Sequence, residues 1–202
     1  MKRKIAILGM ILVSVIFVSV ENGEKRANAY SYYDTLDALK TEEIKLYAAH
    51  PIKAAKAKAC ASTAESKTGE YWANYTAWQG NGDAFRHAAW SALMTKNIDR
   101  TFAYKAGLAH EGLDTNYNWD KQNYDTKMDI SNNYAGRDIG DSNSSDSDKE
   151  LLKKVKEQTK NGNLKRIRMY TSSNNKNDRT IDGVMTNYVG YYVPTSNGGL
   201  LK

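Results

Sequence analysis

The sequence lacks several features that would place it quickly in a known class. It has one cysteine, Cys60, in 202 residues, so no disulfide can form within the chain. Cys60 lies in an alanine-rich segment, which favours a small buried residue over a reactive thiol. The sequence contains no G-x-S-x-G motif, so nothing in it indicates acyl-enzyme chemistry on a serine. No strongly apolar segment follows residue 29, which argues against a toxin that disrupts membranes.

The first 29 residues have the pattern of a secretory signal peptide. Lys2, Arg3 and Lys4 precede the apolar run 5–20, and Ala27-Asn28-Ala29 has the small-x-small pattern of a cleavage site. The run of 16 residues is shorter than the roughly 20 that a spanning helix needs. We therefore expect cleavage after Ala29, secretion, and one globular domain over 30–202, with an uncleaved anchor as the alternative. A disulfide-free exported chain with a lysine-rich signal is typical of Gram-positive bacteria.

Positive charge is concentrated at the two ends of the sequence. The first 29 residues hold five basic and two acidic residues, so their removal lowers the formal charge from +6 to +3. A net charge of +3 is weak evidence for binding to nucleic acid, and no specific nucleic-acid binding is expected. Residues 149–179 carry a net +7, whereas residues 30–148 carry −4. The basic segment fits either peripheral contact with an anionic envelope surface or a solvated helix and hairpin.

Periodicity and capping residues predict a mainly helical domain with a short C-terminal β-hairpin or sheet element. The expected helices cover 35–49, 51–66, 84–96, 100–111, 127–140 and 148–160, and the expected strands cover 164–171 and 184–193. Asp83 and Asp99 are expected to be N-caps, Gly112 to end a helix, and Ser147 with Glu150 to form a capping box. Residues 113–126 have no periodicity and predict a long loop.

Four aromatic residues crowd the segment 69–80, namely Tyr71, Trp72, Tyr75 and Trp78. Their rings either wedge between helices as core or line a groove for sugar rings or acyl chains.

Residues 81–140 hold the groups that are best suited to chemistry. Asp83 and His87 are four residues apart on one helix face, where a carboxylate can fix the tautomer of an imidazole. Arg86 and Trp90 flank His87 on the same helix. His110 and Glu111 close the next helix, but residue 114 is aspartate, so the HExxH zinc motif is absent.

The helix expected over 127–140 carries an unusual polar stripe. Its members recur at the spacing of a buried apolar face and are Asp129, Asn132, Asn133, Gly136, Arg137 and Gly140. Glycine, asparagine and aspartate are poor helix formers, so their presence on one stripe suggests that the stripe has a function that offsets this cost. Gly136 would allow a substrate or another backbone to approach the helix closely.

Two chemistries fit these groups. Either a divalent metal such as Zn²⁺ activates water, or a metal-free general acid–base pair hydrolyses the substrate. The predicted catalytic residues, which are also the tentative metal ligands, are His87, His110, Glu111 and Asp129. The predicted substrate-binding residues are Arg86, Trp90, Asn132, Asn133, Gly136 and Arg137. The structural alternative is a buried polar network that joins three helices.

Three motifs in this order resemble a bacterial domain family of unknown function. They are Phe85-Arg86-His87-Ala88-Ala89-Trp90, then Ala109-His110-Glu111, then the run from Met128-Asp129 through Asn132-Asn133 to Gly136-Arg137 and Ile139-Gly140. The resemblance covers about 81–140 and implies an exported, toxin-associated domain, without implying a substrate.

The resulting hypothesis is a secreted hydrolase that acts on an envelope component or a small substrate, with a toxin-like role left open. A phosphoester or phospholipid fits the arginines and the basic segment better than a peptide does. The alternative is a non-catalytic secreted binding module, in which the aromatic segment and the polar stripe form a recognition groove. No obligate protein partner is evident.

Overall fold

The fold is mainly helical, as predicted, with a two-stranded antiparallel sheet near the C-terminus. It comes from a computed structural model that describes residues 39–171 and 188–201. The predicted signal peptide lies outside these residues. The described α-helices are α3 (Thr41–Ala49), α4 (Pro51–Tyr71), α5 (Asn81–Asn97), α6 (Arg100–His110), α7 (Tyr124–Ser142) and α8 (Asp148–Lys160). Single 3₁₀ turns occur at Asn74–Thr76 and Trp119–Lys121.

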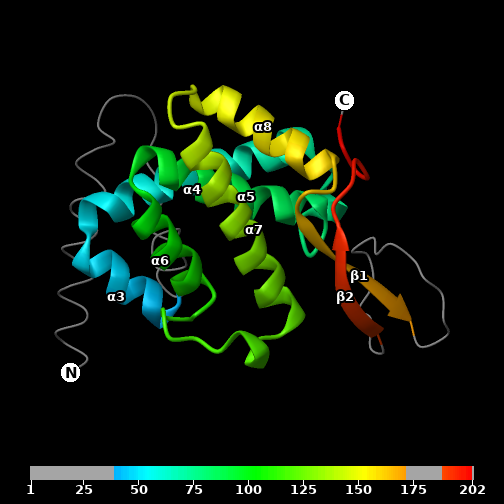
Figure 1. Cartoon of the computed structure of the whole chain (residues 1–202), viewed down its shortest axis with the longest axis horizontal. Helices are drawn as coiled ribbons and strands as arrows, with labels where there is room; N and C mark the ends of the chain where they lie inside the picture. The colour runs from blue at the N-terminus through cyan, green and yellow to red at the C-terminus, as the bar shows by residue number, and fades with distance from the viewer. Residues whose placement is uncertain (1–38, 172–187, 202) are drawn as a thin grey trace, which may run out of the picture.

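Helix α5 is the centre of the molecule. It packs against α4, α6, α7, α8 and the sheet, and nearly all of its residues are buried. Figure 1 shows α5 and α7 within the helical body, α8 along one side, and α3 at the end opposite the strands. The core between these helices is built from Phe85, Leu93 and Met94 of α5 with Leu151 and Leu152 of α8. No helix in the described part of the chain is long and apolar enough to cross a membrane.

The strands β1 (Lys165–Thr171) and β2 (Tyr188–Pro194) pair with Lys165 opposite Pro194 and Thr171 opposite Tyr188. The predicted strand pair is therefore present among the described residues, and residues 172–187, which include the first four residues of the second predicted strand, lie outside them. Asn132 of α7 connects β1 to the helices by two hydrogen bonds. Its side chain donates to the carbonyl oxygen of Lys165 at 2.8 Å and accepts from the Lys165 N–H at 2.9 Å.

Several predicted helix ends are confirmed. The Asp99 side chain accepts a hydrogen bond from the Phe102 N–H at 2.7 Å, so it caps α6 as expected. Gly112 has a φ of +75° just after α6, which is the left-handed conformation that glycine tolerates. Ser147 and Glu150 form the predicted capping box of α8.

Several helix boundaries differ from the prediction, and one of them is the start of α3, which is Thr41 and not residue 35. Helix α5 begins at Asn81 behind Gly80, so Asp83 lies in the first turn and is not the N-cap. Helix α7 begins at Tyr124, because the side chain of Asn123 caps it by accepting from the Thr126 N–H at 2.9 Å. Helix α4 continues to Tyr71, five residues past the predicted end.

The aromatic segment is partly core and partly exposed, and the predicted groove for sugar rings or acyl chains stays a prediction. Trp72 is fully buried and Tyr71 packs edge-on against Phe85, with ring centroids 5.6 Å apart. Tyr75 and Trp78 are exposed. Cys60 is buried as expected, and burial raises the pKa of its thiol to about 11.

Candidate functional site

The first turn of α5 places a carboxylate beside an imidazole. Oδ2 of Asp83 accepts a hydrogen bond from the Gln79 N–H at 2.6 Å, which holds the carboxylate against the start of the helix. His87 lies one turn further, and its Nε2 is 3.6 Å from Oδ1 of Asp83. The imidazole is only 3% exposed, so it has almost no water available to satisfy its nitrogens.

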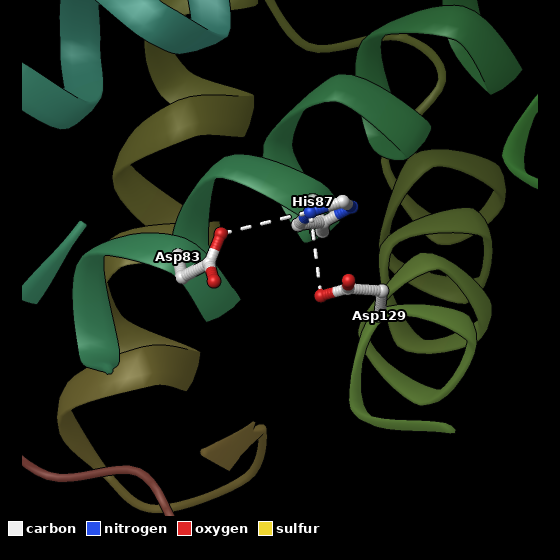
Figure 2. A group of neighbouring side chains, drawn as sticks. All are labelled: Asp83, His87 and Asp129. Carbon is white, nitrogen blue, oxygen red and sulfur yellow. Dashed lines mark ion pairs between the residues drawn. The ribbon is translucent and has the colours of Figure 1, made fainter. Parts of the chain in front are cut away.

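Helix α7 brings a second carboxylate to the same nitrogen. Oδ1 of Asp129 is 3.3 Å from Nε2 of His87, and Figure 2 shows the imidazole lying between the two aspartates. Asp129 is 7% exposed, and its Oδ1 has no hydrogen-bond partner, nor does Nδ1 of His87. Two unsatisfied polar atoms in one buried cluster are uncommon in proteins, and they call for an explanation.

Close contact between α5 and α7 makes this convergence possible. A Cβ at Gly136 would overlap the carbonyl oxygen of Ala88, and one at Gly140 would lie 2.6 Å from that of Ala92. Nearby, the Ser91 hydroxyl donates to the carbonyl oxygen of Asn133 at 2.8 Å. The glycines therefore allow another backbone to approach, which is one of the two roles suggested for Gly136.

Arg86 supplies positive charge at the edge of the cluster. Its guanidinium donates to Oδ1 of Asp83, and its Nη2 lies 3.2 Å from Nε2 of His87. The Arg86 side chain is 32% exposed, so it reaches the cluster from the solvent side.

The second histidine has its own carboxylate partner. Nδ1 of His110, at the end of α6, is 3.0 Å from Oε1 of Glu43 on α3. An ionised carboxylate only accepts hydrogen bonds, so Nδ1 carries the proton and Nε2 is left as the acceptor of a neutral ring. The His110 ring centroid lies 5.8 Å from that of His87 and 5.3 Å from that of Trp90. His110 is 41% exposed, in contrast to His87.

Burial and neighbouring charges shift the pKa values of the ionisable groups around the site. Burial, together with the charges of Asp83, Glu111 and Asp125, raises the pKa of Asp129 to about 10. Burial also raises the pKa of Glu111 to about 7. For His87, burial and the neighbouring Arg86 hold the pKa well below its ordinary value. Burial alone would lower the pKa of His110, but the hydrogen bond and charge of Glu43 outweigh it and raise the pKa.

The structure brings together only part of the predicted ligand set. Among the described residues, the metal-ligand atoms that converge belong to Asp83, His87 and Asp129. His87 and Asp129 were predicted, but Asp83 takes the place of His110 and Glu111. The reason is that Asp83 shares a helix face with His87, whereas His110 turns toward Glu43.

Other predicted substrate-binding residues are engaged elsewhere in the chain. Asn132 holds β1, and the guanidinium of Arg137 lies over the rings of Tyr104 and Tyr134, 5.1 and 5.5 Å from their centroids. Asn133 is an exception, because it is buried against Gly107 but neither its amide nitrogen nor its amide oxygen has a hydrogen-bond partner among the described residues. Trp90 donates to the carbonyl oxygen of Ala57 at 3.2 Å while its ring borders His110.

Two carboxylates beside the histidines, those of Asp83 and Glu43, were absent from the predicted catalytic set. Asp83 was identified only as the partner of His87, although its spacing could have placed it among the ligands. Glu43 is 67 residues from His110 in the sequence, and no local pattern links them.

The chain belongs to the family described as a domain of unknown function, DUF6973, whose model matches residues 44–163. The match starts inside α3 and includes His87, His110, Glu111 and Asp129, and it begins one residue after Glu43. No curated protein and no solved structure matches the chain.

Proposed function

We propose that this protein is an exported bacterial hydrolase that acts on a phosphoester or phospholipid of the cell envelope. The observation that carries the proposal is the pairing of two adjacent imidazoles with buried carboxylates. His110 is bound by Glu43, and His87, whose ring lies 5.8 Å away, is flanked by Asp83 and Asp129. A histidine oriented by a carboxylate is a common general base in hydrolysis.

In this proposal His110 is the base and Glu43 positions it. The half-exposed ring can reach a bound substrate, whereas Glu43 is buried and also accepts a hydrogen bond from the Lys40 N–H at 3.0 Å. Nε2 of His110 takes a proton from water, and the water oxygen attacks the phosphorus or acyl carbon of the ester. Glu111, with a pKa near neutrality, donates a proton to the departing alcohol oxygen.

Positive charge near the site fits an anionic substrate. Arg86 is partly exposed and can hydrogen-bond a phosphate oxygen. The exposed residues Lys149, Lys153 and Lys154 on α8 fall in the basic segment, which suits contact with an anionic envelope surface. The signal-peptide pattern of residues 1–29 supports export.

A non-catalytic secreted binding module remains the second candidate. Its support is that Asn132, Gly136 and Arg137 contact other parts of the chain, as a structural network requires. Under this alternative, changes at His110 alter stability or binding, and no turnover is found.

Hydrolysis assays on the purified protein test the proposal. The substrates are bis(4-nitrophenyl) phosphate, anionic phospholipid vesicles and neutral phospholipid vesicles. We expect turnover on at least one of them, and we expect His110→Gln to lose about a hundredfold or more of it, as removal of a general base does. The control is His50→Gln, since His50 is exposed at the joint of α3 and α4.

The melting temperature of each variant separates catalysis from folding. We expect His110→Gln to melt close to the wild-type temperature, because its ring is half-exposed. Absence of turnover on every substrate, or full turnover by His110→Gln, would contradict the proposed function.

A further inference from the structure

The buried cluster of Asp83, His87 and Asp129 has the composition of a cation site. Each residue offers one ligand atom, and the three atoms lie within 4.8 Å of one another. Two carboxylate oxygens and one imidazole nitrogen are donors that zinc and manganese accept. The site is more than an acidic cluster, because Oδ1 of Asp129 is buried, points at Nε2 of His87 and has no hydrogen-bond partner.

The two spacings from His87 match those around a small divalent cation. In a tetrahedral site with bonds of about 2.0–2.2 Å, two ligand atoms lie about 3.3–3.6 Å apart. Nε2 of His87 lies 3.3 Å from the oxygen of Asp129 and 3.6 Å from that of Asp83. The oxygens of Asp83 and Asp129 lie within 4.8 Å of each other, so small side-chain movements would bring both carboxylates and the imidazole to one cation.

The balance of charge also favours a cation. Asp83, Glu111 and Asp125 all lie near enough to Asp129 to act on its charge, and Arg86 opposes them. Oδ1 of Asp125 is also buried without a hydrogen-bond partner. One guanidinium faces several carboxylates, so a divalent cation would bring the cluster closer to neutrality.

Arg86 lies beside the atoms that a cation would bind. Its guanidinium contacts Oδ1 of Asp83 and Nε2 of His87. Because about a third of the side chain is exposed, the guanidinium can turn toward solvent when a cation enters. There it would still be close enough to meet an anionic substrate.

We propose that Asp83, His87 and Asp129 bind one zinc-sized divalent cation between α5 and α7, with a fourth position left for water. The inference rests on the proposed function only for the role of the cation, which would be to activate that water or to polarise the ester. Binding itself does not depend on any catalytic activity.

Calorimetric titration of the chelator-treated, tag-free protein with Zn²⁺, and separately with Mn²⁺, tests the proposal. We expect one equivalent of at least one of these cations to bind saturably. Loss of a ligand in Asp129→Asn or Asp83→Asn should weaken that binding by about tenfold or more. The matched control is Asp138→Asn, which alters an exposed carboxylate of the same helix α7 that pairs with Arg100.

Asparagine keeps the size of aspartate, and circular dichroism with thermal melting will verify that each variant is folded. Absence of saturable binding by the wild type would overturn the proposal. Equally tight binding by Asp129→Asn would also overturn it, because the cation would then bind at another site. Arg86→Gln should bind at least as tightly as the wild type, because a competing positive charge is removed, and a loss of binding would contradict the displacement of Arg86.

The two proposals fail in different ways. Hydrolysis without cation binding would leave the His110–Glu43 pair as the site of acid–base chemistry. Cation binding without hydrolysis of any tested substrate would leave the metal site in a protein that is not a hydrolase of these esters.

Discussion

Glu43 controls the protonation of His110 from a helix that is distant in sequence. Its carboxylate accepts a hydrogen bond from Nδ1–H of His110, with the two heavy atoms 3.0 Å apart, and is itself almost completely buried. Both the hydrogen bond and the negative charge favour the imidazolium form, so they raise the pKa of His110 against the opposing effect of burial. Glu111 acts in the same direction and Arg86 in the opposite one.

Glu43→Gln should therefore lower the pKa of His110. An amide oxygen still accepts a hydrogen bond, but the negative charge that stabilises imidazolium is lost. The pKa of each histidine can be read from the pH dependence of its ring signals in NMR spectra. Glu42→Gln is the matched control, because Glu42 pairs with Lys45 at 2.7 Å and does not contact His110. An unchanged pKa in Glu43→Gln would mean that Glu43 does not set the charge of His110.

At the scale of elements, the contact between α5 and α7 determines whether the cluster exists. Asp129 reaches His87 only because Gly136 and Gly140 let the two helices pack backbone to backbone. The residues of the polar stripe of α7 therefore have different roles. Asp129 joins the buried cluster, Asn132 holds β1, and the glycines are required for packing.

Gly136→Ala should destabilise the fold. The added Cβ would overlap the Ala88 carbonyl oxygen, and forced overpacking of this kind typically costs about 1–3 kcal/mol. The control is Gly69→Ala in α4, where a Cβ meets no atom within 4 Å and should stabilise the helix by about 0.5–1 kcal/mol. Urea unfolding measures both differences. Equal stability of the two variants would show that α5 and α7 can move apart without a loss in the free energy of unfolding.

At the scale of the whole molecule, the sequence predicts local features better than distant ones. Helix α8 and the start of α6 could be predicted because Ser147, Glu150 and Asp99 act on backbone groups three residues away. The start of α7 was misplaced because the cap at Asn123 lies in a stretch with no apolar periodicity.

The candidate site could be predicted only in part for the same reason. The proximity of Asp83 and His87 follows from helix geometry, whereas the approach of Asp129 depends on how two helices pack. The pairing of Glu43 with His110 joins α3 to α6 across 67 residues, and nothing in either segment indicates it. Long-range contacts of this kind are determined by the tertiary fold and not by local propensity.

The central claim is that the Asp83–His87–Asp129 cluster is a functional site and not a packing network. The pKa of Asp129, raised to about 10, means that the cation-free fold holds this carboxyl protonated near neutral pH, whereas the unfolded chain ionises it above its ordinary value of 3.8. Asp129 therefore costs the fold stability as the pH rises from 3.8 toward 10. Asparagine resembles the neutral carboxyl group, so Asp129→Asn should remove that destabilisation.

The most direct test is to measure turnover and melting temperature together for Asp129→Asn and the wild type at pH 8. The melting temperatures are compared in chelator, with Asp138→Asn as control. We expect Asp129→Asn to melt at the wild-type temperature or above it while its rate of ester hydrolysis falls by about a hundredfold or more. A variant that keeps the wild-type rate, or that loses stability in proportion to its loss of rate, would contradict the claim.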